Sequence, residues 1–160
     1  VAMVADRLER LRFSAKEVKM VETLVRHHLR PGQMAQNELP TRRAIYRYFR
    51  DTGEAGIDVL FLSLADHLAT RGPHLDLSYW REHTRIVEHV LSQHFHEETC
   101  PPKLIDGHDI MNIFGLSPGP RIGEILEAVR EAQVSGEVTA REEALSYIRN
   151  YLQTRAERQE

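Results

Sequence analysis

Apolar side chains recur every three or four positions along most of this chain, the spacing that places them on one face of an α-helix. In the first third, this spacing predicts helices over residues 2–11, 14–29 and 41–53. Ser14 and Glu17 form a capping box at the start of the second helix, and Pro31-Gly32 is expected to end it. Thr41 can cap the third helix through its hydroxyl oxygen.

The next helix is predicted to be the most buried one. Its apolar residues fall on nearly every side and are Ile57, Val59, Leu60, Phe61, Leu62, Leu64, Ala65, Leu68 and Ala69. A helix that is apolar nearly all round is expected in the centre of a fold. Gly72-Pro73 ends it, and a long helix follows over residues 77–94.

A linker is predicted over residues 97–106, where two glutamates and a proline pair interrupt the helical pattern. Beyond it, the spacing predicts helices that begin at Asp106, near Ile122 and at a capping box from Thr139 to Glu142. No segment alternates with a period of two, so no significant sheet is expected.

The expected fold class is therefore all-α, a helical bundle of about seven to eight helices in two small subdomains. Residues 1–96 form the first subdomain and residues 107–160 the second, with the linker 97–106 between them.

Composition and charge narrow the functional classes. Of the 160 residues 41% are hydrophobic and one is cysteine, which fits a folded protein of the reducing cytoplasm. No stretch is long and apolar enough to span a membrane, so no membrane partner is expected. The net charge is -3, but residues 1–50 hold 11 basic against 5 acidic side chains. Attraction to phosphate is therefore expected from the first third of the chain.

Two sets of motifs resemble a known family. The first set resembles the second half of an HD-type helical domain: RLRFS at 10–14, LVRHH at 24–28 and LADHLA at 64–69. The second, more specific set is similar to the C-terminal region of bacterial CCA-adding enzymes and their poly(A) polymerase relatives: LIDGHDIM at 104–111, GLSPGPRIG at 115–123 and GEVTAREEA at 136–144. Together the two sets extend over most of the chain.

The resemblance implies a fragment of an RNA nucleotidyltransferase that carries no complete catalytic site. In that family an N-terminal head domain binds Mg²⁺ and the nucleoside triphosphate, while C-terminal helical regions hold the RNA. No cofactor, metal or catalytic residue is therefore expected in this chain. The expected partners are RNA, as tRNA or another RNA 3′ end, and the protein's own N-terminal catalytic domain. The choice between CCA and poly(A) addition would be made in the head.

Asp66 is a candidate for a vestigial metal ligand, since it lies where HD-type domains place their last metal-binding aspartate. One carboxylate does not make a metal site, so the alternative is a polar residue hydrogen-bonded to a neighbour.

The first RNA-binding candidate is the helix that follows Thr41. Arg43, Arg47 and Arg50 are spaced i, i+4, i+7 and so share one helix face, with Arg42 and Tyr46 beside them. Guanidinium groups suit phosphate, and aromatic rings such as those of Tyr46, Tyr48 and Phe49 can stack on bases. The alternative is a solvated arginine face above buried aromatic residues.

The second candidate is the turn at residues 115–123. Ser117 is expected to cap the following helix, and Gly119 would let a backbone approach closely. Arg121, Ile122 and Gly123 would then present N–H groups to a phosphate. The alternative is that Gly115 and Gly123 serve helix packing alone.

Two other functions stay open on sequence grounds. The chain could be the distal part of an HD-family metal-dependent phosphohydrolase, or a helical interaction module. An upstream Asp-x-Asp strand would favour the transferase, and an intact His…His-Asp run would favour the hydrolase.

The first prediction is catalytic silence. Because two-metal phosphoryl transfer requires paired carboxylates, we expect the isolated chain neither to extend an RNA 3′ end nor to hydrolyse phosphoesters. The measurement is turnover of radiolabelled nucleotide and of a phosphoester with added Mg²⁺ or Mn²⁺. Metal-dependent turnover that Asp66→Ala abolishes would contradict it.

Overall fold

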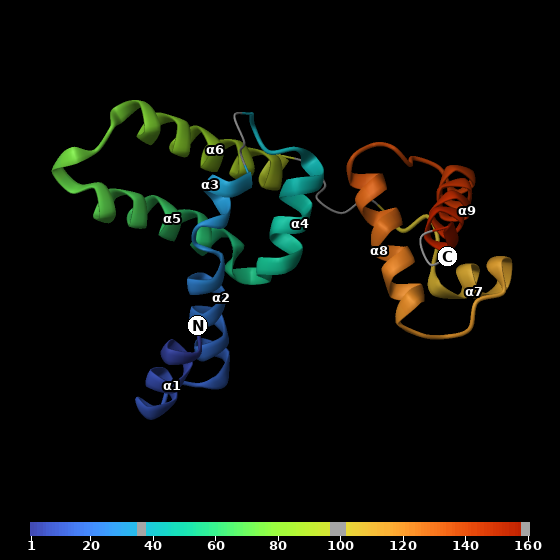
Figure 1. Ribbon diagram of the computed structural model, residues 1–160, viewed down its shortest axis with the longest axis horizontal. Coiled ribbons are helices and arrows are strands. Elements are labelled where there is room, and N and C mark those ends of the chain that lie inside the picture. The colour runs from blue at the N-terminus through green and yellow to red at the C-terminus, as the bar shows by residue number, and fades with distance from the viewer. Residues whose placement is uncertain (35–37, 97–101, 158–160) are drawn as a thin grey trace. The chain divides into compact units, whose positions relative to one another are not determined.

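The computed structural model describes residues 1–34, 38–96 and 102–157, and within them all the regular structure is helical (Figure 1). These residues form nine α-helices and two short 3-10 helices, so the expected all-α class is confirmed. The chain divides into two compact units, residues 1–97 and 98–160, each with its own hydrophobic core. Of the predicted linker over 97–106, residues 97–101 lie outside the described part.

The first unit is formed by α1 (Ala2–Arg10), α2 (Ala15–His27), α3 (Arg30–Met34), α4 (Arg42–Thr52), η1 (Gly53–Ala55), α5 (Gly56–Arg71), η2 (Gly72–His74) and α6 (Leu77–His96). α1 and α2 make a helical hairpin, and α5 and α6 make a longer one (Figure 1). α3 and α4 each pack against both α5 and α6. The core of the unit therefore lies where these four helices meet.

The buried apolar residues of this core come from α4, α5 and α6 and are Ile45, Tyr48, Val59, Leu60, Ile86, Val87 and Val90. Tyr48 is completely buried, and its hydroxyl donates a hydrogen bond of 2.6 Å to the carbonyl oxygen of Gly56. Burial raises the pKa of the Tyr48 phenol. The bond ties α4 to the first residue of α5, and leaving the buried hydroxyl unpaired would cost about 1–3 kcal/mol.

α3 is a helix that the sequence did not predict. The pair Pro31-Gly32 was expected to end the preceding helix, and α2 does end at His27. The chain nevertheless resumes a helix at Arg30 with Pro31 as its second residue. Proline is tolerated in the first turn because its missing N–H has no intrahelical acceptor there. Pro31 is buried, so here the proline begins a short helix instead of stopping one.

α5 is less buried than its sequence predicts. Its buried residues are Gly56, Val59, Leu60 and Ser63. Phe61, Leu62 and Leu68 are exposed instead, although they are large and apolar. α5 is central in the first unit, where it packs against α2, α3, α4 and α6, but one of its sides is not covered by the described residues.

The second unit contains α7 (Gly107–Phe114), α8 (Pro120–Val134) and α9 (Arg141–Glu157). The buried residues of its core are Ile105, Ile110, Ile122, Ile125, Val129, Ala132, Val138, Ala144 and Ile148. Asp106 begins α7 as predicted: its side chain accepts from the backbone N–H of Asp109, whose side chain accepts from Asp106 in return. Gly115 ends α7 with φ 64°, a left-handed conformation that favours glycine.

A salt bridge joins the beginnings of α7 and α9. Arg141 donates two hydrogen bonds to the carboxylate of Asp109, at 2.5 and 2.9 Å, and a third of 3.1 Å to the carbonyl of Leu104. The predicted capping box from Thr139 to Glu142 is displaced by one residue. Glu143 accepts the bonds from Thr139, because α9 begins one residue later than the box requires.

The corner between α4 and α5 yields a prediction about stability. A Cβ on Gly56 would lie 2.7 and 2.9 Å from ring atoms of Phe49 and 2.8 Å from Oγ1 of Thr52. Phe49 cannot move away easily, since its ring stacks on His94 with centroids 3.9 Å apart. We expect Gly56→Ala to lower the free energy of unfolding by about 1–3 kcal/mol, measured by urea denaturation.

Gly32→Ala in the same unit is the matched control. There an added Cβ would meet nothing closer than 3.6 Å, so the variant should be neutral or more stable by about 0.5–1 kcal/mol. Equal stabilities of the two variants would contradict the tight corner.

Candidate functional site

The arginine face of α4, defined as Arg43, Arg47 and Arg50, lies opposite the core. Thr41 caps the helix as predicted, accepting from the backbone N–H of Ala44 at 3.2 Å. Ile45, Tyr48 and Thr52 form the buried side. At about 100° per residue, the three arginines fall roughly half a turn away from that side. Arg47 and Arg50 are exposed and Arg43 is half-buried.

Arg42 and Tyr46 flank this face, with Arg42 exposed and Tyr46 half-buried. The other two aromatic rings of the helix are not beside them. Tyr48 is in the core, and Phe49 packs edge-on to Tyr48 and stacks on His94. Of the aromatic residues in α4, Tyr46 is thus the one placed next to the arginine face.

An acidic side chain offsets part of the positive charge. Asp51 accepts hydrogen bonds of 2.8 Å from Arg50 and 2.8 Å from Arg30. Partial burial raises the pKa of the Asp51 carboxyl, but the two guanidinium groups outweigh burial and hold that pKa below its ordinary value. Asp51 is therefore ionised at neutral pH.

The second candidate, the turn at residues 115–123, is exposed around its glycines and Arg121. Ser117 does not cap α8 as predicted. The N-cap is Gly119, in an extended conformation with φ 168°, and no side chain caps the helix. Pro120 takes the first helical position, for which its missing N–H suits it. The backbone N–H of Ile122 already donates to the Gly119 carbonyl at 3.1 Å, so it is not available to an anion as expected.

Packing does not explain the glycines at this turn. A Cβ added to Gly115, Gly119 or Gly123 would meet no atom within 4 Å. The alternative of close helix packing therefore finds no support in the described residues. Arg121 is exposed on the first turn of α8, and the positive end of the helix dipole lies beside it.

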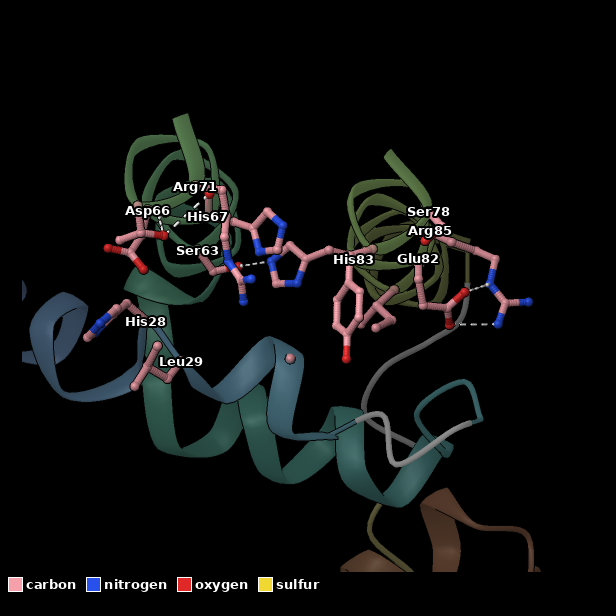
Figure 2. Close-up of a pocket in the computed structure, with 14 residues that line it drawn as sticks. His28, Leu29, Ser63, Asp66, His67, Arg71, Ser78, Glu82, His83 and Arg85 are labelled. Carbon is pink, nitrogen blue, oxygen red and sulfur yellow. Dashed lines mark hydrogen bonds and ion pairs between the residues drawn. The ribbon is translucent and has the colours of Figure 1, made fainter. Parts of the chain in front are cut away.

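Asp66 lines a cavity of about 780 Å³ between α5 and α6 (Figure 2). Other residues around the cavity are His28, Ser63, His67, Arg71, Glu82, His83 and Arg85. In the described part of the chain, no three histidine, cysteine or acidic side chains come together in a way that could hold a metal ion. Asp66 is therefore not assembled with other ligands within that part.

The cavity contains a histidine pair that sequence reasoning missed. His67 from α5 and His83 from α6 point toward one another, with ring centroids 5.2 Å apart and planes at 14° (Figure 2). The hydroxyl of Ser63 and Nε2 of His83 are hydrogen-bonded at 2.9 Å. Burial lowers the pKa of His83, and the charge of His67 lowers it further. The four-residue spacing of Ser63 and His67 was visible in the sequence, but their pairing with His83 depends on the register of the α5–α6 hairpin.

The known proteins that this chain resembles are tRNA nucleotidyltransferases. Residues 80–148 match the family model described as tRNA nucleotidyltransferase domain 2, putative. The chain is 33% identical over 144 residues to the A-adding tRNA nucleotidyltransferase of Deinococcus radiodurans, covering 90% of this chain and 32% of that protein. It is 34% identical over 140 residues to the CC-adding tRNA nucleotidyltransferase of Thermus thermophilus, covering 86% of this chain and 29% of that protein.

The chain therefore belongs to the tRNA nucleotidyltransferase family, and the resemblance drawn from its motifs is confirmed at that level. It spans about a third of the length of these relatives, and of a CC-adding tRNA nucleotidyltransferase from Synechocystis with which it shares 24% identity. No solved structure matches it. None of the helices in the described ranges combines the length and apolarity needed to cross a membrane.

The histidine pair leads to a prediction about pH. Because the pKa of His83 in the folded protein lies below its ordinary value of 6.5, the unfolded chain takes up the proton first as the pH falls. The stability that neutral His83 contributes is present above that value and is lost as the pH falls through the folded pKa. We expect the melting temperature to fall between about pH 7 and pH 5, and to fall less in His83→Gln.

His74→Gln, at an exposed position in η2, is the control and should keep the wild-type pH dependence. If His83→Gln follows the wild-type curve as closely as the control does, the histidine pair does not set the pH response.

Proposed function

We propose that this chain is the RNA-holding part of a tRNA nucleotidyltransferase, which positions the 3′ end of its RNA for a catalytic domain elsewhere in the same polypeptide. One observation carries the proposal: 90% of the chain aligns with about a third of a protein named A-adding tRNA nucleotidyltransferase. The role of that third follows from its chemistry. The arginine face offers guanidinium forks for phosphate oxygens, which suits holding RNA.

In this proposal Mg²⁺ and the nucleoside triphosphate belong to the remainder of the protein, which is also the chain's covalent partner. Carboxylates that bind two metal ions would have to come from there. The first unit would be the second half of an HD-type domain that has been adapted to hold RNA. The protein would act in the cytoplasm, in keeping with the single cysteine of this chain.

RNA binding should depend on the arginine face and on salt. We expect weak binding to tRNA, with an affinity that falls steeply as salt rises, because each neutralised phosphate releases counterions. Arg43→Glu combined with Arg47→Glu should lower the affinity by at least tenfold, compared at a temperature at which both proteins are folded. The measurement is fluorescence anisotropy of labelled tRNA at several salt concentrations.

The matched control is Arg7→Glu combined with Arg81→Glu. Both residues are exposed in the first unit and away from α4, and the pair changes the net charge equally. Equal loss of binding in the two double variants would mean that overall charge, not the arginine face, attracts the RNA. No loss in either would remove the basis of the proposal.

A separate prediction concerns the turn at residues 115–123. We expect Arg121→Ala and Gly119→Val each to weaken tRNA binding about three- to tenfold, the first by removing a charge-assisted contact and the second by blocking close approach of a phosphate. Both proteins should fold, since Arg121 is exposed and the extended backbone and open surroundings of Gly119 accept valine. Wild-type affinity in both variants would show that the turn is structural.

A further inference from the structure

α5 has two apolar faces, and the described helices cover one of them. The covered face carries Val59, Leu60 and Ser63. The second face lies roughly half a turn away and is defined here as Phe61, Leu62, Ala65, Leu68 and Ala69, spaced i, i+1, i+4, i+7 and i+8. We call it the outer face of α5.

The large apolar side chains of the outer face are exposed to solvent. Phe61 is 56% exposed, Leu68 44% and Leu62 36%. Asp58, near the first turn of α5, is the one charged residue of the helix whose position falls on this face. A contiguous apolar stripe of this kind on a soluble protein marks an interaction surface, since leaving each such side chain in water forgoes about 1.5–3 kcal/mol of burial.

We infer that the outer face of α5 binds a helical segment of the same polypeptide, from the part that corresponds to the remaining two thirds of its relatives. This inference rests on the proposed function, which places the catalytic domain in that remainder. The relatives support the occupant, because the region aligned with this chain is 32% and 29% of their lengths. A tethered segment also meets the face at an effective concentration of about millimolar, far above that of a separate partner.

The shape and charge of the face indicate what it would bind. Ala65 and Ala69 stand four residues apart in its middle, with Phe61 and Leu68 on one side and Leu62 on the other. Small residues in such a row form a groove that accepts the ridge of a second helix at about 8–10 Å between axes. A lysine or arginine of that helix would pair with Asp58 at the beginning of α5. A lipid surface is a poorer match, because membrane-bound helices carry lysine and arginine beside the apolar face, where α5 has Arg71 alone.

The test is the reactivity of a thiol placed in the groove. Ala65→Cys puts the thiol in the middle of the outer face, and Glu88→Cys puts one at an exposed position of α6 as control. Cys100→Ser removes the native thiol of the 160-residue chain, and any cysteine elsewhere in the whole polypeptide is likewise replaced by serine. The rate of maleimide labelling is measured for the 160-residue chain and for the polypeptide encoded by the whole gene, at several protein concentrations.

We expect the thiol of Ala65→Cys to react at least tenfold more slowly in the whole polypeptide than in the 160-residue chain, at every concentration, while the control reacts equally in both. Equal rapid labelling in both proteins would overturn the inference. Protection that appears in the short chain and grows with concentration would also overturn it, in favour of a second copy.

The same proteins separate this inference from the proposed function. If labelling is slow in the whole polypeptide but tRNA affinity does not depend on the arginine face, the outer face is an internal contact and the RNA-holding role is wrong. If tRNA affinity depends on the arginine face but labelling stays fast, the RNA-holding role stands and the docking surface is wrong.

Discussion

The corner at which α4 meets α5 fixes how α4 is rotated against α5 and α6. Tyr48 is completely buried there, and its hydroxyl donates a hydrogen bond to the carbonyl of Gly56. The buried ring of Tyr48 and this hydrogen bond together set the rotation of α4 about its axis. The ring of Phe49 lies so close to Gly56 that a Cβ at this position would be 2.7 Å from it. Only glycine fits there without displacing the ring. Because α4 cannot turn, its arginines point away from the core. The candidate RNA surface is thus a consequence of how a tyrosine is buried.

Much of the fold could be predicted from local patterns. The caps at Ser14, Thr41 and Asp106 form as expected, since capping depends on residues three positions apart. The features that were missed depend on longer range or on competition between neighbours. Gly119 caps α8 in place of Ser117 because Pro120 sets the helix start, and the pairing of His67 with His83 depends on how two helices align. The arginine face itself was visible as a spacing, but which aromatic rings remain beside it was not, because rotation of α4 is decided by its core side.

α5 lies in the centre of the first unit as predicted, but one of its apolar sides is exposed. The helix is apolar nearly all round, and such a helix is suited to burial on every side. The pattern of apolar residues does not tell which part of the protein supplies the neighbours. The mismatch between Phe61, Leu62 and Leu68 and their exposure is therefore evidence about the protein as a whole. In the two proposals above, the arginine face of the first unit binds RNA and the outer face of α5 binds the rest of the polypeptide.

Burial of Tyr48 also gives the corner a built-in spectroscopic signal. An exposed phenol ionises near pH 10, with a change in ultraviolet absorbance, whereas burial raises the pKa of Tyr48 above that range. Ionisation of Tyr48 therefore requires the corner to open. An alkaline titration of absorbance includes a contribution from opening at this position, without a label and without a substitution, alongside the global loss of structure.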